Sequence, residues 1–334
     1  MPALGGKVRD VMLGGRQWLW HSPDVPFALP RDGAPYDPHE AAGGIDECFP
    51  TVGSCRLPSW VEGAHRAKLP DHGELWAQPP AISIITDDEG HSATCTWSGA
   101  ALPYRFTRRI TVRPEGSVAF AYAATNTGKH RIPFLWSSQP VFPLTPKTRL
   151  FLPDGAVTKL WSQRDAEFGD RGSEHKWPRL RNGGRLVDLS RPFNALGGDY
   201  ACKLFVQLPR REVIVAVEEG GSRLEMLLHG REIPTVGIAI DRSTKGAGAL
   251  RGLWPFGKKR RQLCTVSIEP CLGAPESLSD ALGAWDDVHW LEPGATARWG
   301  MTWRGGLKSE DRGPRTEDRR PKYDDGRSKM ENDC

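Results

Sequence analysis

Short segments in which apolar and polar residues alternate are the feature that most limits the fold of this 334-residue chain. A period of two is typical of a strand with one buried face, because successive side chains of a strand point to opposite sides. Val118, Phe120 and Tyr122 share one face in this way. Alternating or otherwise β-rich segments are predicted at residues 81–86, 92–97, 104–112, 117–124, 200–208, 213–218, 223–229, 263–269 and 296–303.

Clusters of Gly, Pro, Asn and Asp separate these segments, as in Pro114-Glu115-Gly116, and such clusters are typical of turns. Only residues 276–284 have the pattern of a helix, and that helix would be short. Many short strands joined by turns favour an all-β protein. The sequence therefore predicts a large antiparallel β-sandwich.

The end of the chain differs in composition from the rest. Residues 305–334 include sixteen charged residues, eight of each sign, and only four apolar ones. Such a segment buries too little apolar surface to offset the entropy lost on ordering. Although the length alone would also allow two domains, we expect a single domain over residues 1–304, followed by a charged disordered tail.

The charges and apolar runs exclude two classes of partner. The formal net charge is +4, and both signs are scattered along the chain, so no nucleic-acid partner is expected. The longest apolar runs, such as 213–217, have about five residues, whereas a membrane-spanning helix needs about 20. The first ten residues also lack the apolar stretch of a secretory signal. No membrane association is expected.

The seven cysteines have no spacing typical of a zinc or redox motif. We therefore expect reduced thiols in a cytoplasmic protein, with no metal and no other cofactor. The basic run Lys258-Lys259-Arg260-Arg261 is interpreted as a solvated loop, with an anion-binding role as the alternative.

Two ionisable residues lie beside Gly or Pro at predicted bends, where the backbone can approach a ligand. His72, which precedes Gly73, is a candidate acid/base group or hydrogen-bond donor. Glu269, which precedes Pro270 at the end of an apolar strand, is a candidate base whose pKa burial would raise. For each residue a purely structural role is the alternative.

The segments around these candidates have a recognisable order: G-G-I-D-E-C-F-P-T at 43–51, D-H-G-E-L-W at 71–76 and I-E-P at 268–270. Further matches are G-R-Q-W at 15–18, Asn126 with F-L-W-S-S at 134–138, Ser277-Leu278 and E-P-G at 292–294. From about residue 11 to residue 304, the chain resembles the galactose mutarotase-like superfamily of aldose 1-epimerases, and especially its divergent bacterial branch. The resemblance implies one supersandwich of antiparallel strands with a concave, sugar-binding face.

The resemblance also implies a reaction. In aldose 1-epimerases a glutamate takes the proton of the anomeric hydroxyl and a histidine protonates the ring oxygen, so that the ring opens and closes again as the other anomer. The Ile-Glu-Pro context matches Glu269 to this base. The His-Gly context matches His72 to the family histidine that contacts the sugar near its ring oxygen.

One position departs from the family pattern. Where the family has His-Pro, and with it the principal general acid, this chain has Gln139-Pro140. A glutamine amide donates a hydrogen bond but does not give up a proton at neutral pH. Two alternatives follow. Either His72 or a water supplies the proton in an active epimerase, or the protein is a sugar-binding or sensing relative that has lost turnover.

Other residues of the matched segments are candidates for contact with a sugar. The candidates for stacking on its C–H faces are Trp76, Trp136 and Trp254, with core packing as the alternative. The candidates for hydrogen bonds to its hydroxyls are Asp46, Glu47 and Arg66; Asp46 and Glu47 could equally brace their own loop.

The sequence is thus interpreted as a carbohydrate-binding, aldose 1-epimerase-like isomerase whose partner is a small-molecule sugar. Neither the identity of the sugar nor the oligomeric state is predicted. A third alternative is an accessory domain that binds another protein through the same face, for which an exposed apolar patch is expected in place of a polar cleft.

Overall fold

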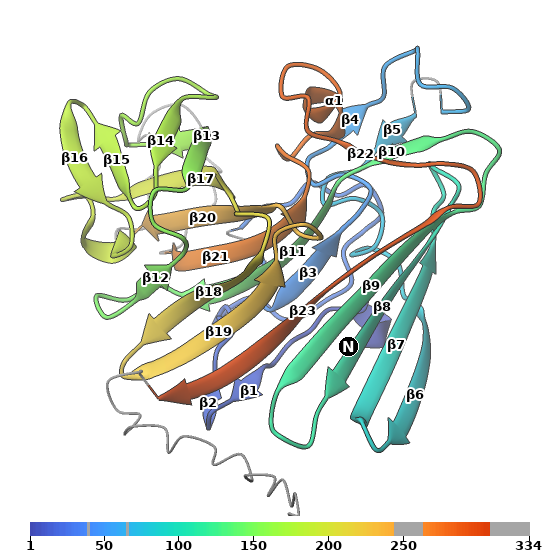
Figure 1. Cartoon of the computed structure of the whole chain (residues 1–334), viewed down its shortest axis with the longest axis horizontal. Helices are drawn as coiled ribbons and strands as arrows, with labels where there is room; N and C mark the ends of the chain where they lie inside the picture. Colours follow the sequence, from blue (N-terminus) through green and yellow to red (C-terminus); the bar gives the residue numbers. More distant parts are fainter. Residues whose placement is uncertain (39–40, 65–66, 244–262, 308–334) are drawn as a thin grey trace, which may run out of the picture.

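The structure is a computed structural model that describes residues 1–38, 41–64, 67–243 and 263–307. Two large antiparallel sheets make up most of this part of the chain (Figure 1). The first contains nine strands of the described residues, in the order β16 (Arg185–Asp188), β15 (Arg179–Asn182), β14 (Glu174–Lys176), β13 (Val157–Arg164), β17 (Tyr200–Gln207), β20 (Thr235–Ser243), β21 (Leu263–Leu272), β11 (Trp136–Pro143) and β3 (Ile45–Cys48).

The second sheet contains eight strands of the described residues, in the order β12 (Arg149–Phe151), β18 (Glu212–Glu219), β19 (Ser222–His229), β23 (Thr296–Leu307), β9 (Val118–Asn126), β8 (Tyr104–Val112), β7 (Gly90–Ser98) and β6 (Ala81–Asp87). Shorter strands pair as β1 (Met12–Leu13) with β2 (Arg16–Gln17), β4 (Cys55–Arg56) with β5 (Lys68–Leu69), and β10 (Ile132–Phe134) with β22 (His289–Leu291). The helical segments are η1 (Pro2–Leu4), η2 (Pro192–Asn194) and α1 (Leu278–Ala281).

The predicted antiparallel sandwich is confirmed. Each of the nine predicted segments lies on a strand and extends past the end of that strand by at most one residue. Residues 104–112 are the whole of β8, whereas β7, β9, β21 and β23 are longer than the predicted segments by two or more residues at one end. The predicted helix is shorter than 276–284, because α1 spans only Leu278–Ala281. The Ser277 side chain caps it by accepting a hydrogen bond from the backbone N–H of Asp280.

One hydrophobic core lies between the sheets, and the period of two decides which residues reach it. On three neighbouring strands of the first sheet, the fully buried core residues include Leu204, Ile238 and Ile268. Residues one position away point to the opposite, outer face of this sheet. They include Lys203, Gly237 and Glu269, so the alternation that builds the core also places polar residues on one outer surface.

The last strand ends later than the predicted domain boundary at residue 304. β23 continues to Leu307, and its last three residues pair with Ser222, Arg223 and Leu224 of β19. The rest of the predicted tail, residues 308–334, lies outside the described residues, as do Arg66, Trp254 and the run 258–261. In the part of the chain that the structure describes, no helix is long and apolar enough to cross a membrane.

Candidate functional site

A cavity of about 410 Å³ opens on the outer face of the nine-stranded sheet. Three of the candidate residues from separate parts of the sequence line it together: His72, Gln139 and Glu269. Gln139 comes from β11 and Glu269 from the neighbouring strand β21, whereas His72 follows β5 in a loop. The sheet thus brings together groups that are 67 and 130 residues apart in sequence.

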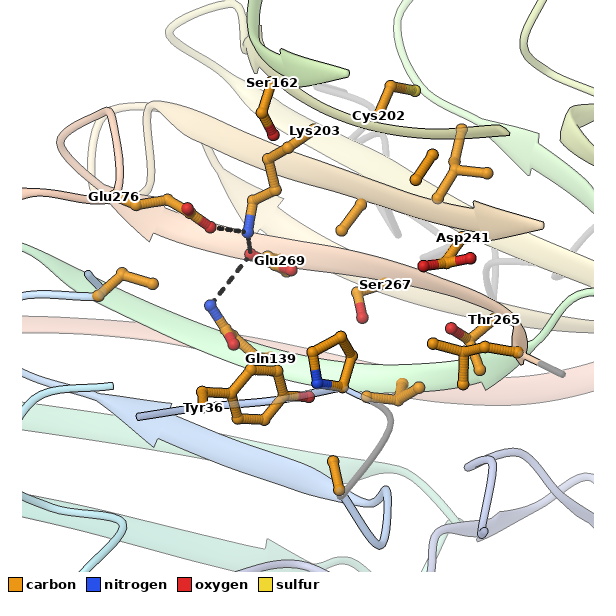
Figure 2. Close-up of a pocket in the computed structure, with 18 of the residues that line it drawn as sticks. Tyr36, Gln139, Ser162, Cys202, Lys203, Asp241, Thr265, Ser267, Glu269 and Glu276 are labelled. Atoms are coloured by element: carbon orange, nitrogen blue, oxygen red, sulfur yellow. Dashed lines mark hydrogen bonds and ion pairs between the residues drawn. The ribbon is translucent and has the colours of Figure 1, made fainter. Parts of the chain in front are cut away.

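Lys203 of β17 is the central cation of this cavity (Figure 2). Its Nζ lies 2.5 Å from Oε2 of Glu269 and 2.7 Å from Oε1 of Glu276. The Gln139 amide donates a hydrogen bond to the same Oε2 of Glu269, at 3.3 Å. Trp161 donates from Nε1 to Oε2 of Glu276, at 2.9 Å. Each carboxylate therefore has one further donor besides the shared ammonium.

Burial and the ion pairs set the charge states of this group. Burial raises the pKa of the Glu269 carboxyl, and the nearby Lys203 ammonium offsets only part of this rise. Burial by itself would lower the pKa of Lys203, but the two carboxylates outweigh it and raise that pKa above its ordinary value. For Glu276 burial is again unfavourable to the charge, yet the Lys203 ammonium holds its pKa below the ordinary value. Glu269 is thus the carboxylate that takes up a proton more readily.

His72 forms a second wall of the cavity, in a left-handed backbone conformation (φ 60°) that turns the chain before Gly73. Its ring stacks on Tyr36 with 3.8 Å between ring centroids, and its Nδ1 lies 3.4 Å from Oδ1 of Asp71. Its Nε2 is buried and has no hydrogen-bond partner among the described residues. A buried polar atom in this state is open to a bond from a ligand.

No protein-family model matches the sequence, and no curated protein matches it. Solved structures do match the fold. The Slr1438 protein of Synechocystis sp. PCC 6803 is 16% identical, with a TM-score of 0.62 over 92% of this chain and 91% of that one. A Klebsiella pneumoniae protein with a proposed aldose 1-epimerase activity is 13% identical, with a TM-score of 0.59 over 92% and 76%.

A galactose mutarotase-related enzyme of Lactobacillus acidophilus is 15% identical, with a TM-score of 0.51 over 89% of this chain and 91% of that one. Together with the two-sheet topology, these similarities decide the fold. The chain has the galactose mutarotase-like fold. At such low identities the similarity extends to the fold and no further.

Within the galactose mutarotase-like fold, the structure corrects the predicted role of Glu47. Its side chain points between the sheets and is absent from the cavity wall, because it neighbours Asp46 in β3 and adjacent residues face opposite sides. Its carboxylate accepts hydrogen bonds from Arg108, Tyr122 and Trp136 at 3.3, 3.1 and 2.9 Å. Burial raises the pKa of this carboxyl although the Arg108 guanidinium opposes the rise. Glu47 therefore has a structural role, as the alternative interpretation expected, but it braces the two sheets and not its own loop.

Three further candidates do not line the cavity. Asp46 faces the same side as its register partner Gln139 but is held by Lys7, whose Nζ is 2.5 Å from its Oδ2. Trp136 is fully buried in the core. Trp76 lies behind the cavity wall, with its ring centroid 5.0 Å from that of His72. Both tryptophans are therefore packed in the protein and do not line the cavity, which is the alternative interpretation of these two stacking candidates.

The cavity is also lined by Lys203, Glu276, Tyr36 and Trp20, none of which was predicted from the sequence. Lys203 carried a usable signal, because it is the only charged residue in the run Y-A-C-K-L-F-V. A lysine in the middle of an otherwise apolar strand is buried only when it is paired. The other three lie outside any clear strand pattern and carried no comparable signal. Among the described residues, no group of His, Cys, Asp and Glu could hold a metal ion.

Proposed function

We propose that the protein is an aldose 1-epimerase-like isomerase that binds an aldose in this cavity and interconverts its anomers by opening the ring. The observation that carries the proposal is the meeting of Glu269, His72 and Gln139 in one cavity. The aldose 1-epimerase activity proposed for the Klebsiella pneumoniae structure supports it. We also propose a single domain, predicted over residues 1–304 and extended by β23 to residue 307, since both sheets share a core.

Glu269 is the proposed base. A base for the anomeric hydroxyl must be ionised and within hydrogen-bond reach of the sugar, and its catalysis is most efficient when its pKa is close to the working pH. Glu269 lines the cavity, and burial raises its pKa while the Lys203 ammonium offsets part of this rise. These two opposing effects suit a carboxylate that takes up and releases a proton in each turnover.

His72 and Gln139 are the proposed partners of the sugar oxygens. The free Nε2 of His72 can bond to the ring oxygen or a neighbouring hydroxyl. The Gln139 amide, which now bonds to Glu269, has a second N–H and an oxygen for a sugar hydroxyl. Both residues fix the orientation of the ring relative to the base.

The second candidate function is sugar binding without turnover. Gln139 favours it, because an amide occupies the position at which the family pattern has its general acid. The fold alone does not separate the two functions, since sites and not folds decide activity.

The deciding experiment measures anomerisation of purified single anomers of common aldoses by polarimetry or NMR, with binding followed by calorimetry. We expect the wild-type protein to accelerate anomerisation and the Glu269→Gln variant to lose roughly 100-fold or more of that acceleration. Glu174→Gln, an exposed carboxylate on β14, is the matched control. If the protein binds an aldose but anomerisation proceeds at the uncatalysed rate, the second candidate function, sugar binding without turnover, is established instead.

A further inference from the structure

Ring opening needs an acid as well as a base, and the residue at the family position of the acid is Gln139. The structure shows two donors in contact with the Glu269 carboxylate, the Gln139 amide and the Lys203 ammonium. Of these, only the ammonium can transfer a proton. The question is therefore whether Lys203 is placed to serve the ring oxygen.

We propose that Lys203 is the general acid of the reaction, delivering the proton to the ring oxygen from the position where it now contacts both Glu269 and Glu276. This inference rests on the proposed function. It names a catalytic residue that neither the sequence motifs nor the family resemblance indicated.

The first argument is geometric. The anomeric hydroxyl and the ring oxygen are bonded to the same carbon, so the base and the acid must end close together. Nζ of Lys203 and Oε2 of Glu269 are 2.5 Å apart, and both residues line the cavity. A hemiacetal that inserts between them would present its hydroxyl to the carboxylate and its ring oxygen to the ammonium.

Glu276 supplies the second argument, because it keeps Lys203 in place when Glu269 turns to the sugar. Its Oε1 lies 2.7 Å from Nζ, and its other oxygen accepts the Trp161 N–H. The ammonium therefore retains one carboxylate partner throughout the step. Glu276 is in this account a positioning residue, since it acts through Lys203.

The Glu269 carboxylate takes the proton of the anomeric hydroxyl, the C1–O1 bond becomes a carbonyl, and the bond between C1 and the ring oxygen breaks. The electron pair of that bond stays on the ring oxygen, which takes a proton from Lys203. The products are an open-chain aldehyde with a new hydroxyl, a neutral Glu269 and a neutral Lys203. Rotation about the C1–C2 bond and the reverse transfers give the other anomer.

The chemistry of the leaving oxygen suits an ammonium. As the ring opens this oxygen develops alkoxide character, and an alkoxide is far more basic than an amine. The Lys203 ammonium, held between two carboxylates, stays charged in the resting protein. It can still protonate the ring oxygen when this oxygen becomes an alkoxide. In the open-chain state the Lys203 amine is neutral, and it takes its proton back from the new hydroxyl when the ring closes.

The pH profile distinguishes Lys203 from His72 as the acid. A histidine acid loses its proton near its ordinary pKa of about 6.5, so the rate would fall above neutrality. A lysine acid predicts that kcat/KM stays level to at least about pH 9, since the ordinary lysine pKa is about 10.4 and the two carboxylates raise the pKa of Lys203 further. The other titratable or charged groups that line the cavity are Tyr36, Asp71, His72, Arg164, Cys202, Asp241, Glu269 and Glu276.

The test compares Lys203→Arg and Lys203→Met with the wild-type protein. Arg retains the charge between the two carboxylates but holds its proton much more tightly. We expect Lys203→Arg to fold, to bind the aldose within about threefold of wild type, and to anomerise it roughly 100-fold more slowly. Lys176→Met, which removes an exposed lysine on β14, is the matched control and should keep the wild-type rate.

A rescue experiment adds a second readout. In the Lys203→Met background, Gln139→His supplies a different acid from β11, the strand next to the β21 strand that carries Glu269. We expect part of the rate to return, with a new loss of activity above about pH 7 that the wild-type protein lacks. If Lys203→Met does not fold, the Lys203→Arg rate and the wild-type pH profile still decide whether Lys203 is the acid.

The outcomes separate this inference from the proposed function. A wild-type protein with no acceleration for any aldose would overturn the proposed function, and the role of Lys203 with it. Two outcomes with an active wild-type protein would overturn the role of Lys203 alone. One is a Lys203→Arg rate within about threefold of the wild-type rate. The other is a wild-type rate that falls near pH 7 and is lost in the His72→Asn variant.

Discussion

Gly237 lies directly opposite Glu269 in the register of β20 and β21, and its missing side chain is what gives the Glu269 carboxylate its room. A Cβ at residue 237 would lie 3.2 Å from Oε2 and 3.3 Å from Cβ of Glu269, and 3.6 Å from Cε of Lys203. β20 separates β17 from β21, so Lys203 has to reach across it to Glu269. The glycine makes this crossing possible.

Gly237→Ala is therefore expected to disturb the ion pair more than the fold. The added methyl group would displace Oε2 by a few tenths of an ångström, and small displacements of catalytic groups cost much activity. We expect the rate of anomerisation to fall about 10-fold or more, while the melting temperature changes by less than about 4 °C. Gly197→Ala, at a glycine with open space around it, is the control. An unchanged rate would show that the site tolerates the methyl group.

The acid limb of the pH profile reports on Glu269. The base works in its ionised form, so activity is lost as the pH falls through its pKa, and burial raises that pKa. We expect kcat/KM to fall at a pH above the ordinary glutamate value of about 4.3. In Lys203→Met the ammonium that lowers this pKa is absent, so the limb should move to still higher pH. If the acid limb of Lys203→Met lies at the same pH as that of the wild-type protein, the limb reports on a group other than Glu269.

Glu47→Gln is expected to lower stability through the core of the sandwich. The Glu47 carboxylate and the Arg108 guanidinium are both almost fully buried, at 1% and 2% side-chain exposure. Removing one charge leaves the other buried without its counter-charge, which costs about 3–5 kcal/mol. Urea unfolding should show this loss.

Two comparisons test that prediction. Glu174→Gln breaks an exposed pair with Lys159 and should cost less than about 1 kcal/mol. Adding Arg108→Met to Glu47→Gln should cost less than the two single losses together, because the second change removes the unpaired charge. Strictly additive losses would show that the two groups do not stabilise each other.

Truncation separates the last strand from the residues that follow it. Residues 308–334 are rich in charge and poor in apolar groups, so a chain that ends at Leu307 should keep the wild-type melting temperature within about 2 °C. A chain that ends at Arg304 also loses the pairing of residues 305–307 with β19, and Gly305 packs closely against Leu13. We expect its melting temperature to fall by about 2–4 °C or more. Equal melting temperatures for the two truncations would contradict this.

Local patterns in the sequence determined the fold class and part of the site. The alternation of Leu224, Met226 and Leu228 predicts one buried face, and all three are buried in β19. Patterns of this kind are local, because each strand buries its own alternate residues. The His-Gly and Glu-Pro contexts likewise indicated His72 and Glu269 as candidates. Only His72 lies at a bend, however, because β21 continues past Glu269 to Leu272 and the predicted bend there is wrong.

The tertiary structure alone decided which of these side chains meet, and on which side of the sheet. Glu47 and its neighbour Asp46 are equally polar in sequence, but the register of β3 against β11 turns Glu47 into the core. Lys203 is recognisable as unusual, yet its partners lie 66 and 73 residues away, and only the strand order β17-β20-β21 brings Glu269 within its reach. Strand order and register follow from packing over the whole chain, so no local pattern contains them.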